Sequence, residues 1–90
     1  MGRKEIVTRV IDGDTFETGS RKKPVRLANV NAPEKGTQGG AAATRALRNL
    51  VKGETVLIQT VARDKFGRSV ANVKAGSRSV NAAMRRKGYK

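Results

Sequence analysis

The sequence contains no histidine, no cysteine and no tryptophan, and its only aromatic residues are Phe16, Phe66 and Tyr89. Without histidine or cysteine, the chain can form no Ser-His-Asp triad, no cysteine nucleophile, no disulfide and no zinc site of the usual kind. Acidic residues are also scarce, with 7 Asp and Glu against 20 Lys and Arg. Any catalysis must therefore depend on carboxylates, hydroxyls, Lys, Arg or a hard metal ion.

Long hydrophobic runs are missing as well. No stretch approaches the roughly 20 apolar residues of a membrane span, and the N-terminus lacks the apolar core of a signal peptide. We therefore expect no membrane partner, and both a secreted protein whose leader has been removed and a bacterial cytoplasmic protein fit the sequence. A length of 90 residues with 37% hydrophobic content predicts a single domain, residues 1–90, with a thin aliphatic core.

The formal net charge of +13 indicates a polyanionic partner. Nucleic acid, either DNA or RNA or both, is favoured over an anionic membrane surface, because no stretch is both amphipathic and rich in large apolar residues. A basic protein that only contacts the nucleic-acid backbone is the alternative. Three of the few acidic residues, Glu5, Glu17 and Glu54, lie in strand-like contexts and are interpreted as surface charges.

The hydrophobic pattern predicts five strands and two helices. The expected strands are 5–11, 15–18, 25–30, 55–62 and 69–74, and the expected helices are 41–52 and 80–87. A helix between the third and fourth strands is the order of an OB-fold barrel, so the fold class is mainly β (α+β), with a short C-terminal helix. In the third strand, alternation places Asn29 on the face of Val25 and Leu27, and Val30 on the face of Arg26.

The segment Asp12-Gly13-Asp14-Thr15 places two carboxylates on either side of a glycine in a tight turn. A compact loop of this kind can supply oxygen ligands to Ca²⁺. It can equally be a hairpin turn in which Asp and Gly satisfy the backbone geometry. An EF-hand is excluded, because no Glu follows at the required spacing.

Three further residues are candidates for chemistry, each with a simpler alternative. Arg26 is either an arginine on the solvent face of a sheet or a guanidinium that binds a phosphate. Glu34, at the end of Asn31-Ala32-Pro33-Glu34, is either a general base or a solvated loop residue. Arg68 either borders the Asp64–Arg68 hairpin or is a second phosphate ligand. Together with the acidic turn, they form the set that phosphodiester hydrolysis requires without histidine.

Six segments occur in an order that resembles the staphylococcal nuclease (thermonuclease) family. They are VIDGDTF at 10–16, VRL at 25–27, NAPE at 31–34, DKFGR at 64–68, VN at 80–81 and GY at 88–89. The resemblance runs from about residue 5 to residue 90. It implies an OB-fold barrel and a Ca²⁺-dependent nuclease that cleaves DNA and RNA with low sequence specificity and leaves 3′-phosphate ends.

The resemblance also implies roles for individual residues. Asp14 matches the metal-binding carboxylate, and Asp12 and Thr15 match residues that support it in the same turn. Arg26 and Arg68 match the two phosphate-binding arginines, and Glu34 matches the glutamate that activates the attacking water. The remaining candidates are Asn31 and Ala32 at the metal, through a side-chain and a backbone oxygen respectively, and Lys65 beside Arg68 as a nucleic-acid contact.

Two features depart from the family. Asn31 stands where the family usually has a second metal-binding Asp, so we expect weaker Ca²⁺ binding. Relatives usually continue beyond Lys90, so we expect a monomer with a more open site or lower stability, or a partner that completes it. A catalytically weak OB-fold module that binds nucleic acid is therefore the alternative function. Phe16 and Phe66 are core candidates, which leaves little capacity for base stacking.

Overall fold

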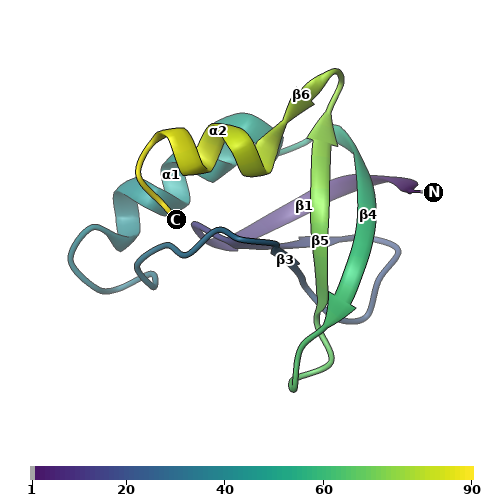
Figure 1. The fold of residues 1–90 in the computed structure, drawn as a ribbon, viewed down its shortest axis with the longest axis horizontal. Coiled ribbons are helices and arrows are strands. Elements are labelled where there is room, and N and C mark those ends of the chain that lie inside the picture. Colours follow the sequence, from purple (N-terminus) through teal and green to yellow (C-terminus); the bar gives the residue numbers. More distant parts are fainter. Residues whose placement is uncertain (1) are drawn as a thin grey trace.

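Six strands and two helices follow one another along residues 2–90, the part of the chain that the computed structural model describes (Figure 1). The strands are β1 (Arg3–Asp12), β2 (Thr15–Thr18), β3 (Val25–Leu27), β4 (Thr55–Arg63), β5 (Ser69–Ala75) and β6 (Arg78–Ser79). The helices are α1 (Gly40–Val51) and α2 (Val80–Arg86). Neither helix is long and apolar enough to cross a membrane, a finding limited to these described residues.

Five of the strands close into a barrel. The hydrogen-bonded order is β3-β2-β1-β4-β5, and a parallel pairing of β3 with β5 joins the two ends. The short strand β6 adds to the free side of β5. With α1 between β3 and β4, this is the OB-fold barrel that the sequence predicts, and closure leaves few unpaired edges.

The barrel interior and the inner faces of both helices form one aliphatic core. Its largest fully buried side chains include Phe16, Leu27, Leu47, Ile58 and Met84, and valines fill most of the remaining space. Each side chain of this size contributes about 1.5–3 kcal/mol by its burial. Figure 1 shows α1 and α2 together against one end of the barrel, with the β4–β5 hairpin extending away from them.

The third strand is shorter than the sequence predicts. It ends at Leu27 because Asn29 adopts a left-handed conformation, with a φ of 58°. The chain therefore leaves the sheet, and the predicted alternation over 28–30 is wrong. Asn29 is exposed, whereas Val30 points into the core beside Leu27 and is fully buried.

Two other expectations about the fold need correction. Strand β6 is not among the predicted strands, because its two residues are too few to produce an alternating pattern. Glu5 is predicted to be a surface charge, but its side chain is only 2% exposed. Its carboxylate accepts hydrogen bonds from Thr18 at the end of β2 and from Ser20 and Arg21 in the loop that follows, and these bonds compensate for its burial.

Candidate active site

The Asp12–Thr15 turn joins β1 to β2 and brings Asp14 to the loop after β3. Asp12 Oδ1 accepts a hydrogen bond of 3.2 Å from the backbone N–H of Asp14, which closes the hairpin turn. A Cβ at Gly13 would lie 2.6 Å from the Cβ atoms of both Ala32 and Ala43. Only glycine fits this close approach, so Gly13 allows the turn to pack against the loop after β3 and against α1.

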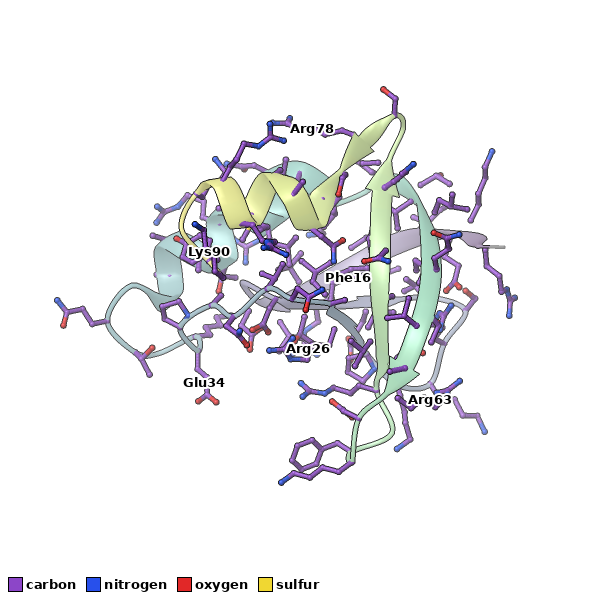
Figure 2. All side chains as sticks on the ribbon, viewed as in Figure 1. Phe16, Arg26, Glu34, Arg63, Arg78 and Lys90 are labelled. Carbon is purple, nitrogen blue, oxygen red and sulfur yellow. The ribbon has the colours of Figure 1, made fainter. Side chains whose placement is uncertain are left out.

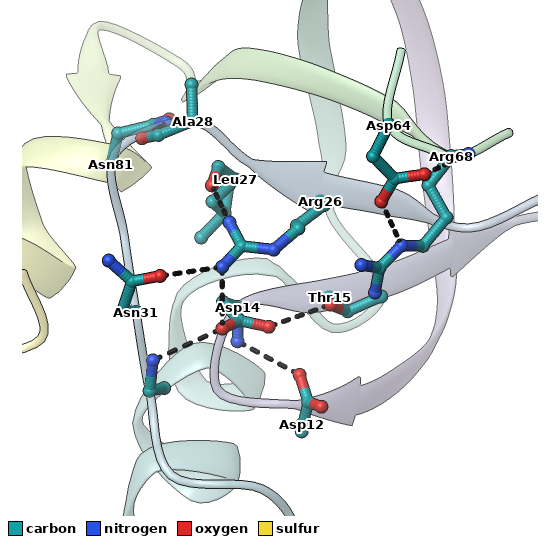
Figure 3. Close-up of polar contacts among 11 residues, drawn as sticks. Asp12, Asp14, Thr15, Arg26, Leu27, Ala28, Asn31, Asp64, Arg68 and Asn81 are labelled. Carbon is teal, nitrogen blue, oxygen red and sulfur yellow. Dashed lines mark hydrogen bonds and ion pairs between the residues drawn. The ribbon is translucent and has the colours of Figure 1, made fainter. Parts of the chain in front are cut away.

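Asp14 lies at the centre of the polar contacts in Figure 3 and is 8% exposed. Its Oδ1 accepts a hydrogen bond of 2.8 Å from the Thr15 hydroxyl. Its Oδ2 accepts one of 3.2 Å from the backbone N–H of Ala32 and lies 3.5 Å from Arg26 Nη2. Asp14 is therefore held by neighbours on β2, on β3 and in the loop after β3.

Arg26 projects from the middle of β3, where the sheet pairs it with Thr15 of β2. Its Nη1 donates a hydrogen bond of 2.9 Å to the Leu27 carbonyl, and its Nη2 donates one of 2.8 Å to Asn31 Oδ1. The same Nη2 faces Asp14, so the Asp14 and Asn31 oxygens converge on one point. Arg26 is thus fixed in the site rather than extended into solvent.

Arg68 reaches the same region from the β4–β5 hairpin. Its Nε donates a hydrogen bond of 2.6 Å to Asp64 Oδ2, while Asp64 Oδ1 accepts the backbone N–H groups of Phe66 and Arg68. Desolvation acts to raise the pKa of Asp64, but the hydrogen bonds from Arg68 and Phe66 outweigh it and lower this pKa. Figure 3 shows both arginine side chains extending toward the Asp12–Thr15 turn.

The pKa of Asp12 is raised above its ordinary value. Burial is the largest cause, and the neighbouring Asp14 carboxylate adds to it by hydrogen bonding and by repulsion. A neighbouring carboxylate at this distance disfavours the charged form of Asp12.

Glu34 and Lys65 lie outside this group of contacts. Glu34 is exposed in the loop between β3 and α1, and Figure 2 shows its side chain pointing into solvent. Its carbonyl accepts hydrogen bonds from Thr37, and any side chain at Gly40 would collide with that carbonyl. Within residues 2–90, no hydrogen bond or ion pair joins the Glu34 carboxylate to the arginines or to Asp14. Lys65 is exposed at the hairpin tip.

The core assignment of Phe66 is wrong. This side chain is 63% exposed at the hairpin tip, where Lys65 Nζ lies 5.3 Å and Arg68 Cζ 5.4 Å from the ring centroid. The turn signal of its own segment places it away from the barrel, whereas Phe16 lies on β2 and is fully buried.

Asn81 supports the site in a way that the sequence analysis did not assign. It is buried at the start of α2, where its Oδ1 accepts the backbone N–H of Val73 at 2.8 Å. Its Nδ2 donates to the carbonyls of Ala28 and Ala71. Asn81 therefore ties the chain just after β3, which leads to Asn31, to β5. The sequence carried two signals for it: its place in the VN segment at 80–81, and a polar residue on the apolar face of a short helix.

A family model described as "Staphylococcal nuclease homologue" matches residues 24–90. An "Uncharacterized endonuclease" of Escherichia coli O157:H7 is 41% identical over 85 residues, covering 91% of this chain and 56% of its own length. "Protein ParB" of Escherichia coli is 38% identical over 97 residues, with coverages of 96% and 54%. A "Micrococcal nuclease" of Shigella flexneri is 35% identical over 75 residues, with coverages of 81% and 42%.

The chain thus spans about half the length of the curated relatives it matches. The matched region nevertheless includes both arginines and the loop that follows β3. The fold, the order of the motifs and these similarities agree, and the chain belongs to the staphylococcal nuclease family.

Proposed function

We propose that this protein is a nuclease that hydrolyses phosphodiester bonds of DNA and RNA with low sequence specificity. The observation that carries the proposal is the approach of two arginines to the Asp12–Thr15 turn (Figure 3). Arg26 on β3 faces the Asp14 carboxylate at 3.5 Å, and Arg68 extends toward the same turn from the β4–β5 hairpin. The relatives named endonuclease and micrococcal nuclease support the same class of reaction.

The two arginines supply the phosphate site. Their guanidinium groups now bond to Asn31, the Leu27 carbonyl and Asp64. A phosphodiester is an anion whose two free oxygens can accept bidentate hydrogen bonds from a guanidinium. As negative charge grows on the phosphate oxygens in the transition state, two fixed guanidinium groups stabilise it without having to reorganise.

We further propose Ca²⁺ as the cofactor, held by Asp14, Asn31 and the backbone oxygen of Ala32, with Asp12 and Thr15 holding the turn in place. The donor chemistry fits, because hard cations prefer carboxylate, amide and carbonyl oxygens. The Asp14 and Asn31 oxygens already converge on one positively charged group, Arg26 Nη2, whose place Ca²⁺ would take. Within residues 2–90, no three acidic side chains gather at one point, so neutral oxygens and solvent must complete the coordination. A bound divalent ion would neutralise the phosphate and lower the pKa of water.

Glu34 is proposed as the base that accepts a proton from the attacking water. The water oxygen would bond to phosphorus as the bond from phosphorus to the 5′-oxygen breaks, which gives a 3′-phosphate and a 5′-hydroxyl. Glu34 lies in the same loop as Asn31 and Ala32 and is exposed. Within residues 2–90, no ion pair occupies its carboxylate. The same exposure favours the alternative function, a module that binds nucleic acid through Arg26, Lys65 and Arg68 but cleaves it poorly.

Cleavage of labelled single-stranded DNA, in Ca²⁺ and in EDTA, separates the two functions. We expect Arg26→Ala to slow cleavage by about 10²–10³-fold and Glu34→Gln by about 10²–10⁴-fold. Arg9→Ala and Glu17→Gln are matched controls, since this exposed pair joins β1 to β2 with a 3.4 Å contact. Binding without Ca²⁺-dependent cleavage, or cleavage that Glu34→Gln leaves at the control rate, would establish the binding module instead.

A further inference from the structure

A second group of cations surrounds a hollow of about 320 Å³ at the end of the barrel near the β4–β5 hairpin. The hollow is lined by Ser69 and by five basic residues, which we call the basic cluster: Arg3, Arg21, Lys22, Lys23 and Arg63. They come from the start of β1, the loop between β2 and β3, and the end of β4. Segments far apart in the sequence thus bring their positive charges to one place.

Most of this charge lacks a neutralising partner. In the described part of the chain, residues 2–90, four arginines form ion pairs with carboxylates, and Arg21 is the only one of them in the basic cluster. Within the same residues, Arg3, Lys22, Lys23 and Arg63 therefore line the hollow without an ion pair to a carboxylate. Like charges in this arrangement repel one another, and an anion in the hollow would relieve the repulsion.

The cluster is also held in place. Arg21 donates from Nε to Glu5 at 2.8 Å and from Nη1 to the Ser69 hydroxyl at 3.0 Å. Arg63 donates from Nη1 to the Gly67 carbonyl at 3.2 Å. Glu5 fixes the position of Arg21, and its charge cancels only one of the five cations. The remaining positive charge faces solvent, because Arg3, Lys22, Lys23 and Arg63 are all exposed.

The hairpin connects the basic cluster to the candidate active site. A Cβ at Gly67 would lie 3.0 Å from Lys23 Cδ, so the Lys23 side chain runs along the hairpin that carries Arg68. Ser69, which lines the hollow, directly follows Arg68 and pairs with Val25, one residue before Arg26. In Figure 2, Arg26 and Arg63 lie on the same lower side of the molecule, whereas Arg78 lies on the upper side.

We propose that the basic cluster binds backbone phosphates of the substrate strand beyond the phosphate that is cleaved. This inference rests on the proposed function and extends it, because it makes long polynucleotides better substrates than short oligonucleotides. Cations that contact phosphates without reading bases give affinity without sequence specificity. An OB-fold commonly binds a strand of about 4–16 nucleotides, so an extended track of this kind is expected on the barrel surface.

The test compares two triple variants with the same change of charge. The cluster variant carries Lys22→Gln, Lys23→Gln and Arg63→Gln. The control variant carries Lys52→Gln, Lys74→Gln and Arg78→Gln, at exposed positions outside the hollow. Affinity for fluorescent single-stranded DNA is measured by anisotropy in EDTA over a range of salt concentrations, with a long and a short oligonucleotide.

Each lost phosphate contact reduces the slope of log K against log salt by about 0.7 for a single strand. Over an approximately fourfold rise in salt, the long-strand affinity of wild type should therefore fall about twentyfold more than that of the cluster variant. The control variant should keep the wild-type slope. The proposal is overturned if the two triple variants show the same slope and the same dependence on strand length.

Cleavage in Ca²⁺ provides a second measurement. The ratio of kcat/KM for the long strand to kcat/KM for the short strand should fall about tenfold in the cluster variant relative to the control. An unchanged ratio in a wild type that does cleave contradicts the inference. If wild type cleaves neither strand, the proposed function fails, while the binding slopes still decide the role of the cluster.

Discussion

Replacing Glu5 by Gln tests whether the buried carboxylate and its partners stabilise the barrel. Glu5 lies on β1, and its carboxylate accepts hydrogen bonds of 2.6 Å from Thr18, 2.8 Å from Ser20 and 2.8 Å from Arg21. Gln has nearly the same shape, but it removes the charge, and its NH₂ group cannot accept hydrogen bonds as the oxygen that it replaces does. The variant therefore leaves Arg21 without its counter-charge.

The size of the effect follows from the burial of the two groups. Removing one partner of a fully buried ion pair costs about 3–5 kcal/mol. Arg21 retains 17% exposure and keeps its hydrogen bond to Ser69, so the lower end applies and we expect a loss of about 3 kcal/mol. A domain of this size has roughly 5–15 kcal/mol of stability. The expected fall in Tm is therefore about 10–25 °C.

The loss should also depend on pH. Burial acts to raise the pKa of Glu5, but the hydrogen bonds from Thr18, Ser20 and Arg21 outweigh it and hold the pKa below its ordinary value. Because the folded-state pKa is lowered, the stabilisation is complete above the unfolded-state pKa and is lost as pH falls through the folded-state value. The difference between wild type and Glu5→Gln should be constant near neutral pH and shrink below about pH 4.3.

Urea unfolding followed by circular dichroism measures this difference, with Glu17→Gln as the control. Glu17 is also a strand glutamate paired with an arginine, but Arg9 is largely exposed, and such surface pairs contribute about 0–1 kcal/mol. The reasoning is refuted if Glu5→Gln unfolds at the urea concentration of the control, or if its deficit grows as the pH falls.

Two further substitutions test the candidate site and its support. Asn31→Asp adds a negative charge beside Asp14, so calorimetric titration should show about tenfold tighter Ca²⁺ binding. Unchanged binding would place Asn31 away from the metal. Asn81→Ala leaves the backbone N–H of Val73 and the carbonyl of Ala28 without their partner in a buried region. Chemical unfolding should therefore show that the free energy of unfolding falls by about 2–3 kcal/mol, and a fall below about 0.5 kcal/mol would contradict this role.

The order of the five barrel strands and two helices along the chain could be predicted, because each of these elements is marked by a pattern within its own residues. Alternating β-branched residues mark β1, β4 and β5, and an alanine-rich run with a glycine after it marks α1. The end of β3 could not be predicted, because an asparagine can adopt either an extended or a left-handed conformation, and the sequence does not show that Asn29 adopts the left-handed one. After this turn the side chains no longer alternate between the two faces of the sheet, and Val30 is buried in the core.

The polar residues likewise fall into those that a local motif identifies and those whose surroundings depend on distant parts of the chain. Asp14, Arg26 and Arg68 lie in short motifs whose order carries the resemblance, and the structure brings these three side chains into one region. Glu5 was misplaced because its burial depends on Arg21, which lies 16 residues further along the chain. Clusters assembled from segments far apart in the chain leave no periodic signal in a sequence, and the basic cluster, which joins β1, the β2–β3 loop and β4, is of this kind.

The most direct test of the nuclease function is the rate of single-stranded DNA cleavage in Ca²⁺ by wild type, Arg26→Lys and Arg68→Lys. Lysine keeps the positive charge but loses the planar, bidentate geometry that fixes a phosphate. We predict Ca²⁺-dependent cleavage by wild type and a fall of about 10²-fold in kcat for each variant, with folding and strand affinity largely retained. No cleavage by wild type, or equal rates in all three proteins, would contradict the assignment of these arginines to catalysis.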